Sequence, residues 1–372
     1  MIINQYYIIY EYFIFELLLK KIKKYMGTIL VTGGAGFIGS HTCVQLLKEG
    51  YEVCILDSLV NSSEVTIKQI KKIILKHNKS TIGNLFFKKG DLRNKNLLDE
   101  IFVEFKDKRN PIDAVIHFAG LKSVEESVNH PLKYYDFNVN STLCLLDAMK
   151  KYECNTLVFS SSATIYDPNY GGKFNETSPR NPINPYGSTK LTIEKILEDL
   201  SFSKSAEWKI VNLRYFNPVG AHESSLIGEN PIIRPTNLFP LIMKVANREY
   251  DCLSIFGNDW PTKDGTCIRD FIHVMDLADA HLASLDYLMR SKAQIIAINI
   301  GTGNGTSVIE VIEKFTQVTK ISIPYKFEER RKGDTACLIA DSSLALELLN
   351  WKPKRDLCDM CFDSWRYLNK NI

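Results

Sequence analysis

The sequence predicts an α/β protein: a doubly wound parallel sheet followed by a smaller C-terminal α/β domain. Short apolar runs alternate with amphipathic, helix-like segments through the first part of the chain, as they do where helices join the strands of a sheet. The runs are apolar without alternation, which indicates strands that are covered on both faces. Polar residues and glycines follow several of them, at the strand ends where ligands bind in this architecture.

The expected elements follow one another without a low-complexity linker. In chain order they are the strand Thr28–Thr32, the helix Ser40–Glu49, the strand Glu52–Asp57, a strand ending before Gly90-Asp91, and strands within Ala114–Gly120, Leu157–Ser162 and Ile210–Arg214. After about residue 215 the chain has more Pro, Asn and Gly and less regular alternation. We therefore expect residues 27–215 to form the sheet domain and 216–372 the smaller domain, with a segment near 270–300 returning to the sheet.

Composition favours a small ligand. The chain has 372 residues, 24% of them charged, and a net charge of only +3, so neither nucleic acid nor an acidic membrane surface is indicated as a partner. Its nine cysteines lie mostly within apolar runs, which is typical of reduced thiols and predicts a cytoplasmic location. Cys358 and Cys361 have no second pair or histidine cluster beside them, so we interpret them as helix packing and predict no metal site.

The first 26 residues are atypical. Residues 2–19 are mostly apolar and four lysines follow them, but Glu11 and Glu16 interrupt the run and no basic region precedes it. Met26 stands immediately before the first strand. We interpret the stretch as an extension or an over-long gene model, and a membrane anchor is the less favoured alternative.

A glycine-rich turn lies between the first strand and the first helix, at Gly33-Gly-Ala-Gly36-Phe-Ile-Gly39. Glycines there permit a tight turn and a close approach of the backbone to a pyrophosphate, which also meets the positive end of the helix. Asp57 ends the next strand, where a carboxylate can accept hydrogen bonds from a ribose and repel a 2′-phosphate. These features predict a Rossmann-type domain that binds NAD rather than NADP.

Two further clusters are expected to face the same crevice. Asp91-Leu92, Phe118–Lys122 and Ser160–Ser162 follow the later strands, and such strand ends meet at one edge of a sheet. Tyr186 and Lys190 lie one turn apart on an expected helix, so the ammonium can favour the phenolate form of the tyrosine and lower its pKa. That pair suits proton transfer, although the same spacing also occurs on solvated helices.

Several motifs together resemble the UDP-glucose 4-epimerases of the extended short-chain dehydrogenase/reductase family. They are Thr32-Gly-Gly-Ala-Gly-Phe-Ile-Gly-Ser-His41, His117-Phe-Ala-Gly-Leu-Lys122, Ser160-Ser-Ser-Ala-Thr164, Tyr186-Gly-Ser-Thr-Lys190, Leu213-Arg-Tyr-Phe-Asn-Pro-Val-Gly-Ala-His222, Phe256-Gly-Asn-Asp and Arg269-Asp-Phe-Ile-His-Val274. The likeness runs from about residue 27 to the end. The first two motifs are shared with many relatives, whereas the Arg-Tyr-Phe-Asn-Pro-Val-Gly-Ala-His run is much more specific.

The resemblance implies a reaction and three catalytic residues. UDP-glucose and UDP-galactose would be interconverted, as in galactose metabolism, by inversion at sugar carbon 4 through a 4-keto intermediate and transient NADH. Tyr186 would remove the proton of the 4-hydroxyl, and Lys190 would bind the nicotinamide ribose and lower the pKa of the tyrosine. Ser162 would hydrogen-bond the reacting oxygen. A homodimer is also implied, through helices that include the segment after Tyr186.

The same resemblance implies two sets of contact residues. Those implied for NAD are Gly33, Gly36, Phe37, Ile38, Gly39, Asp57, Ser58, Asp91, Leu92, Phe118, Ala119, Gly120, Lys122, Tyr186, Lys190 and Phe216. Those implied for the UDP-hexose are Lys122, Ser162, Tyr186, Asn217, Asn237, Leu238, Ser254, Ile255, Phe256, Arg269, Arg331, Asp334 and Leu338. Arginines suit a diphosphate because a guanidinium can make paired, charge-assisted hydrogen bonds to it.

Three departures from the family pattern stand out, and two alternative functions remain open. Asp167 replaces the usual glycine after Tyr166, which bears on the shape of that loop. Phe137 occupies the position of a cofactor-lining asparagine, with Asn138 kept beside it. Leu338 is intermediate between a tyrosine that narrows the sugar pocket and a cysteine that widens it, which leaves N-acetylated UDP-sugars open as substrates. A nucleotide-sugar 4,6-dehydratase would carry an acidic pair after Ser162, where this chain has Ala163-Thr164. A non-catalytic NAD-binding protein would not need the proton-transfer residues.

Overall fold

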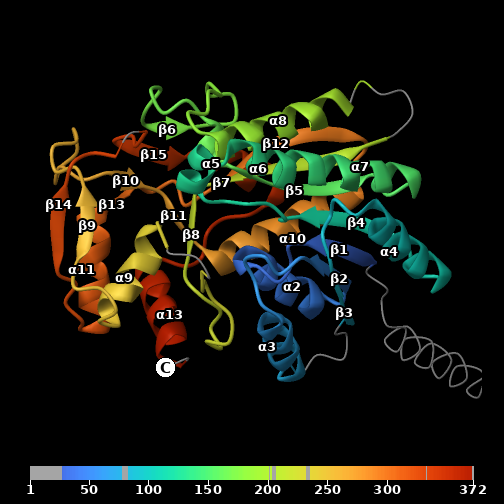
Figure 1. Ribbon diagram of the computed structural model, residues 1–372, viewed down its shortest axis with the longest axis horizontal. Helices are drawn as coiled ribbons and strands as arrows, with labels where there is room; N and C mark the ends of the chain where they lie inside the picture. The colour runs from blue at the N-terminus through green and yellow to red at the C-terminus, as the bar shows by residue number, and fades with distance from the viewer. Residues whose placement is uncertain are drawn as a thin grey trace, which may run out of the picture.

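The computed structural model describes residues 27–77, 83–200, 202, 207–231, 235–331 and 333–370 (Figure 1). The interpretations of residues 1–26 as an extension, a gene-model error or an anchor therefore lie outside the described residues. Within those described ranges, no helix combines the length and the apolar character that crossing a membrane requires.

A seven-stranded sheet in which every pair of neighbouring strands is parallel forms the centre of the larger part. Its strands, in spatial order, are β12 (Gln294–Ile300), β7 (Lys209–Tyr215), β5 (Thr156–Ser162), β4 (Ile112–His117), β1 (Thr28–Thr32), β2 (Glu52–Asp57) and β3 (Leu85–Lys89). The strand order reverses between β1 and β4. That reversal is the topological switch point at which ligands bind in such sheets.

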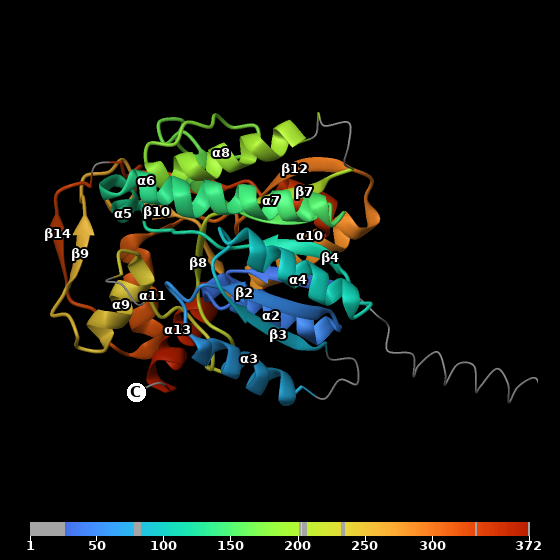
Figure 2. The same ribbon diagram turned by 45° about the vertical axis from the view of Figure 1, so that its right-hand side comes forward.

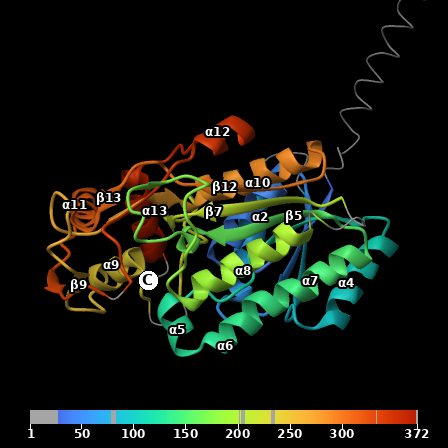
Figure 3. The ribbon, with the colours of Figure 1, turned by 90° about the horizontal axis from the view of Figure 1, so that it is seen from above.

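Helices cover both faces of this sheet, as Figure 3 shows from above. One face carries α2 (Phe37–Glu49), α3 (Glu64–Leu75), α10 (Val274–Arg290) and α12 (Ser343–Leu349), and the other carries α4 (Lys95–Asp107), α7 (Ser141–Lys151) and α8 (Pro185–Leu200). In β1, Ile29 and Val31 pack into the first core while Leu30 packs into the second. Because both faces are buried, the strands need apolar residues at every position. The predicted doubly wound α/β fold is confirmed.

Local signals placed several element ends correctly, although β4, β5 and β7 begin one or two residues before the expected runs. The strands β1 and β2 have the predicted bounds, and Gly50 ends α2 in the left-handed conformation, with φ of 97°. The helix itself begins at Phe37 rather than at Ser40. Its N-cap, Gly36, has no side chain that could signal the start, so the prediction was wrong by three residues.

A smaller lobe lies beyond one end of the sheet, on the left in Figure 2. It contains a four-stranded sheet of β13 (Thr306–Ser307), β10 (Ile268–Arg269), β15 (Cys337–Ala340) and β6 (Lys173–Phe174), and the two-stranded pairs β11 (Phe271–His273) with β8 (Asn217–Val219) and β14 (Tyr325–Glu328) with β9 (Leu253–Phe256). Its helices α9 (Leu238–Ala246), α11 (Val308–Thr319) and α13 (Leu357–Lys370) share one apolar core. Cys361 of α13 is buried in that core.

Short helices follow two of the central strands. They are α5 (Val124–Asn129), α6 (Pro131–Tyr134), the π-helix η1 (Tyr135–Asn140) and the 3₁₀-helix η2 (Ala163–Ile165). The first three follow β4 and the last follows β5. They therefore stand at the carboxyl ends of the central strands, where the chain borders the cleft.

Candidate active site

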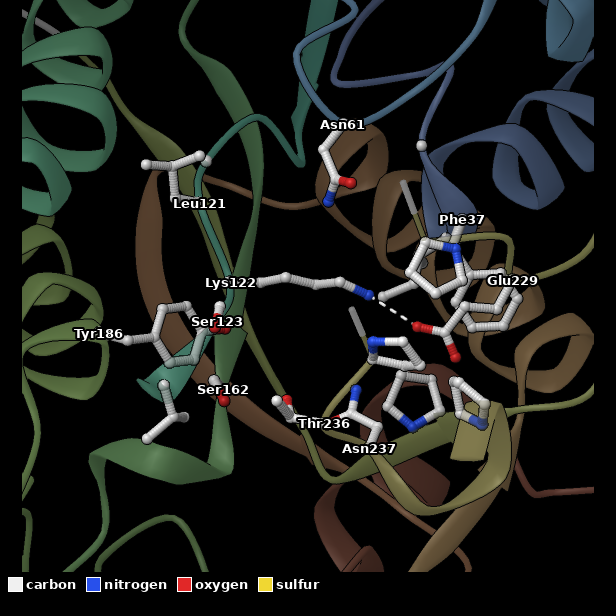
Figure 4. Close-up of a pocket in the computed structure, with 18 of the residues that line it drawn as sticks. Phe37, Asn61, Leu121, Lys122, Ser123, Ser162, Tyr186, Glu229, Thr236 and Asn237 are labelled. Atoms are coloured by element: carbon white, nitrogen blue, oxygen red, sulfur yellow. Dashed lines mark hydrogen bonds and ion pairs between the residues drawn. The ribbon is translucent and has the colours of Figure 1, made fainter. Parts of the chain in front are cut away.

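A cleft of about 1890 Å³ lies between the carboxyl ends of the central strands and the smaller lobe (Figure 4). Pockets for single drug-sized ligands span roughly 300–1,000 Å³, so this space suits a dinucleotide together with a second nucleotide ligand. Every NAD-binding and substrate-binding residue predicted from the sequence lines it. The fold thus brings together side chains from both the larger sheet and the smaller lobe.

The glycine-rich turn forms the floor of the cleft and leaves no room for side chains at two positions. A Cβ on Gly33 would lie 2.7 Å from the backbone nitrogen of Ala119, and Gly33 has φ of +71°. A Cβ on Gly39 would lie 2.4 Å from the carbonyl oxygen of Gly33. The bare backbone therefore lines the cleft at the start of α2, where a helix N-terminus attracts phosphate. This cradle fits the pyrophosphate of a dinucleotide.

Asp57 is held at the end of β2 with its carboxylate toward the turn. It accepts hydrogen bonds from the backbone nitrogens of Ala35 (3.0 Å) and Leu59 (2.9 Å) and from Oγ of Ser62 (2.8 Å). A carboxylate offers about four acceptor sites, so it can still accept from a ribose hydroxyl. Its charge would repel a 2′-phosphate placed there, and the residues present fit NAD.

Phe137 packs against the guanidinium of Arg93 at the cleft. The guanidinium of Arg93 lies 3.8 Å from the centre of the Phe137 ring, and its Nε and Nη2 donate to the Asp91 carboxylate at 3.0 and 2.6 Å. The hydrogen bonds with Arg93 lower the pKa of Asp91. The neighbouring Asn138 is buried and exchanges hydrogen bonds with the backbone of Leu121. Asn138 therefore shapes the loop that carries the predicted ligand Lys122.

The predicted catalytic residues converge from two elements. Tyr186 and Lys190 lie on α8, and Ser162 ends β5; their exposed fractions are 8%, 5% and 7%. Nζ of Lys190 donates to the carbonyl oxygen of Ser160 at 2.7 Å and lies 5.9 Å from the centre of the Tyr186 ring. Figure 4 shows the Tyr186 ring beside Ser123 and above Ser162. A phenol, an ammonium and a hydroxyl thus meet at one wall.

Burial shifts the pKa values of two of the groups at this wall. Burial raises the pKa of Tyr186, and a hydrogen bond with Ser162 acts in the opposite direction. Burial also lowers the pKa of Lys190 to about 8, against the raising effect of Glu194. Desolvation of the phenol is the largest effect on the pKa of Tyr186, and the ammonium of Lys190 is turned toward Ser160. The lowering of that pKa by Lys190 stays a prediction.

At the other end of the cleft, two arginines converge on one carboxylate. Nε of Arg331 donates to Asp334 at 3.0 Å, and Nη2 of Arg269 lies 3.7 Å from the same carboxylate. The guanidinium of Arg331 also lies 4.6 Å from the centre of the Phe256 ring. Two guanidiniums beside an aromatic ring suit a nucleoside diphosphate, whose phosphates need cations and whose base needs a flat surface.

Leu338 borders the region between these arginines and Tyr186. It lies on β15, beside Arg269 of β10 in the sheet register, and packs against a buried cluster that includes Phe174 and Phe216. The predicted residues Asn217, Asn237 and Leu238 line the same end of the cleft from β8 and the start of α9.

Two side-chain contacts at the site were not expected from the sequence. Nζ of Lys122, on the loop after β4, pairs with Glu229 of the smaller lobe at 2.8 Å, as the dashed line in Figure 4 marks. Tyr215 and Ser160 share a hydrogen bond between their hydroxyl groups on β7 and β5. Tyr215 belongs to a quoted motif, whereas no local pattern marks Glu229. Pairs of this kind depend on the folded arrangement.

Fold and site together define an NAD-dependent enzyme of the short-chain dehydrogenase/reductase type. The chain matches the family described as GDP-mannose 4,6 dehydratase over residues 30–363. It is 48% identical to the UDP-glucose 4-epimerase of Bacillus subtilis (strain 168), covering 92% of this chain and 97% of that protein. It is 47% identical to UDP-glucose 4-epimerase 2 of Arabidopsis thaliana, covering 92% and 95%. The chain belongs to the UDP-glucose 4-epimerases, which are NAD-dependent isomerases.

Solved structures agree with this assignment. The UDP-glucose-4-epimerase of Stenotrophomonas maltophila, with bound NAD and formylated UDP-arabinopyranose, superposes with a TM-score of 0.86 at 42% identity, covering 93% of this chain and 98% of that one. The enzyme of Bifidobacterium longum, in complex with NAD+ and UDP, superposes with a TM-score of 0.85 at 44% identity, covering 92% and 98%. The broader dehydratase description does not extend to the site, because Ala163 and Thr164 follow Ser162 without a carboxylate.

Proposed function

We propose that this protein interconverts UDP-glucose and UDP-galactose by inverting carbon 4 of the sugar with retained NAD. The observation that carries the proposal is the meeting of Tyr186, Lys190 and Ser162 with the glycine turn in one cleft. Residues 27–215 would surround NAD, and residues 216–372 would supply most contacts to the nucleotide sugar. NAD, when bound, supplies the reversible acceptor of the sugar's hydride.

Tyr186 is the group that moves the proton of the 4-hydroxyl. Its phenol lies at the cleft wall with Ser162 as a hydrogen-bond partner, so Ser162 can hold the reacting oxygen beside it. Burial keeps the phenol protonated in the ligand-free protein. To act as a base the phenol must first release its own proton to solvent, and the cation of Lys190, one turn away, offsets the cost of the resulting phenolate. That phenolate then takes the proton of the 4-hydroxyl and becomes a phenol again. After the 4-keto sugar has turned over, the same phenol returns the proton to the carbonyl oxygen at carbon 4.

Arg269 and Arg331 would hold the diphosphate, and Phe256 would face the base. Because the diphosphate is fixed and the sugar is attached by a single linkage, the keto sugar can turn over while the nucleotide stays bound. Leu338 would limit the width available for that rotation. UDP-N-acetyl sugars form a second candidate substrate class, favoured by the absence of a bulky aromatic ring at this position.

The protein would act as a cytoplasmic homodimer. Leu132 on α6 and Leu143 on α7 expose 83% and 43% of their surface, on helices beside α8. Exposed apolar side chains on neighbouring helices suit an association surface. The nine cysteines are all free thiols, which fits a reducing compartment. Sedimentation equilibrium of the full chain would show a species of twice the monomer mass.

The Tyr186→Phe variant tests the proposal. Removing the phenolic hydroxyl is expected to lower epimerisation by roughly 10²–10⁴-fold, the usual contribution of a general acid–base group. NAD content should stay unchanged, because the ring and Lys190 remain. Tyr152→Phe provides the control, since this ring stacks on Phe102 on the outer side of the sheet and should leave turnover intact. Comparable turnover in Tyr186→Phe would refute the assigned role.

A further inference from the structure

A buried carboxylate lies one helical turn beyond Lys190. Glu194 of α8 has a side chain with 0% exposure, and it does not line the cleft. Burying a carboxylate is costly unless charged and hydrogen-bonded partners compensate it. Because Glu194 does not line the cleft, its role must lie in the contacts that it makes within the fold.

Glu194 joins α8, which carries Tyr186 and Lys190, to β5, to β7 and to the loop before α8. Nε and Nη2 of Arg214, on β7, donate to Oε1 and Oε2 at 3.0 and 2.6 Å, and Arg214 itself is 3% exposed. Oγ of Ser161, on β5, donates to Oε1 at 2.5 Å. Arg180 reaches the same carboxylate at 3.5 Å from the loop before α8. The carboxylate therefore fixes α8 to β5 and β7 at the level of the reacting residues.

The residue that Glu194 holds on β5 stands between two residues of the site. Ser160, before it, offers its carbonyl oxygen to Lys190, and Ser162, after it, faces Tyr186. A shift of Ser161 would displace both contacts together. The Glu194–Ser161 hydrogen bond thus controls how the end of β5 faces α8.

Arg214 extends the network to the edge of the sheet. Its Nη1 donates to Oη of Tyr166 at 3.1 Å and to the carbonyl oxygen of Glu176 at 2.8 Å. Oη of Tyr166 donates to Asn299 of β12 at 2.6 Å. Because both guanidinium and carboxylate are satisfied by fixed partners, the pair has one favoured arrangement.

We propose that the Glu194–Arg214 pair positions the proton-transfer residues: it holds α8 in register with β5, and the Glu194 carboxylate keeps Lys190 positively charged. The proposal rests on the proposed function of Lys190. A salt bridge that served only for packing would have the first effect and not the second.

The groups around Lys190 decide whether loss of the Glu194 charge raises or lowers the pKa of Lys190. Burial lowers the pKa of Lys190 to about 8, and Glu194 acts against it. On β4, His117 is buried with its pKa lowered to about 3, so it is neutral in the working range. Burial raises the pKa of both Tyr186 and Tyr215, which are likewise neutral. Removal of the Glu194 charge would therefore let Lys190 lose its proton at a lower pH.

The charged groups around Glu194 also favour a lower pKa of Lys190 once the carboxylate is removed. Arg214 and Arg180 face the carboxylate, and burial raises the pKa of Tyr166 and of Glu176 beside Arg214. Both guanidiniums are already present in the wild type and are positive, so their presence does not reverse the direction in which loss of the carboxylate shifts the pKa of Lys190.

Glu194→Gln keeps the shape of the side chain and removes its charge. We expect the alkaline limb of the pH profile of kcat/KM to move down by about one pH unit, as loss of a nearby opposite charge does. Glu198→Gln, one turn further on α8 and paired with Arg180 on the exposed side, is the matched control and should keep the wild-type profile. The Glu194→Gln/Arg214→Met double variant removes both charges, avoids an unpaired buried cation, and should retain the shift.

Lysine Cε resonances in protein labelled with ¹³C-lysine, assigned with Lys190→Met, report the ionisation of Lys190 without any turnover. The midpoint of the Lys190 resonance should fall in Glu194→Gln and in the double variant. An unchanged midpoint in whichever of the two variants folds would overturn the proposal. If the wild type does not epimerise but the midpoint of the Lys190 resonance still falls in the variants, the proposed function is wrong. The electrostatic coupling between Glu194 and Lys190 is then supported independently.

Discussion

Gly33→Ala and Gly171→Ala form a matched pair that tests how the turn binds the cofactor. Both glycines have a left-handed backbone, with φ of +71° and +67°, and this conformation costs a residue with a Cβ about 1–2 kcal/mol. Their surroundings differ. A Cβ on Gly33 would lie 2.7 Å from the nitrogen and 2.9 Å from the Cα of Ala119, whereas nothing lies within 4 Å of a Cβ on Gly171.

The difference in stability between the two variants measures the effect of the close contact between Gly33 and Ala119, which follows β4. Forcing extra atoms into a packed site typically costs about 1–3 kcal/mol, so Gly33→Ala should lose roughly 2–5 kcal/mol in the free energy of unfolding and Gly171→Ala only about 1–2 kcal/mol. Relief of the clash moves the turn away from the position of the pyrophosphate. Each 1.4 kcal/mol lost there weakens NAD binding about tenfold.

Urea unfolding of both purified variants gives the stabilities, and NAD released on denaturation gives the retained cofactor per chain. Gly171→Ala should keep the NAD content of the wild type, while Gly33→Ala should be depleted. Equal stability and equal NAD content in the two variants would show that the space beside Ala119 does not control the turn, and the reasoning would fail.

The other predictions concern the sugar pocket and acid stability. Leu338→Tyr should lower turnover of UDP-N-acetylgalactosamine relative to UDP-galactose by roughly 10–200-fold, the range that a single methylene group commands in a hydrophobic pocket. Leu338→Cys should raise that ratio of turnover rates. If chromatography shows an unchanged ratio in both variants, Leu338 does not control specificity. Burial lowers the pKa of His41 and His117 to about 3 and that of His222 and His281 to about 4. The unfolded chain therefore binds protons first as the pH falls below about 6.5, and each histidine removes about 1.4 kcal/mol of stability per pH unit until the folded pKa is reached. Urea midpoints should fall between about pH 7 and about pH 5, less steeply in His281→Gln, and a flat profile would contradict the assignment of neutral buried histidines.

Much of the central sheet could be predicted from local patterns. The continuous apolar runs at Thr28–Thr32 and Glu52–Asp57 gave the bounds of β1 and β2, because strands buried on both faces leave an unambiguous pattern. The site followed from topology. Parallel strands end at the same edge, so residues after β1, β2, β4 and β5 had to meet there, and the predicted ligands do line one cleft.

Side-chain pairs between segments that are far apart in the sequence leave no comparable pattern. Lys122 and Glu229 are 107 positions apart, and Glu194 and Arg214 belong to different elements. Their partners follow from the fold and not from spacing. The direction of the pKa shift of Tyr186 depends on burial, which the spacing of Tyr186 and Lys190 does not contain. Likewise, nothing local shows that the two-residue strand Lys173–Phe174 joins β15 of the smaller lobe.

The most direct test of the account is to incubate the purified protein with UDP-galactose, without added NAD, and to follow the products by chromatography. We expect conversion to UDP-glucose until both sugars are present at equilibrium, and the same mixture from UDP-glucose, because the cofactor is retained and returns to its starting state in each turnover. No conversion in either direction, even with NAD supplied, would contradict it.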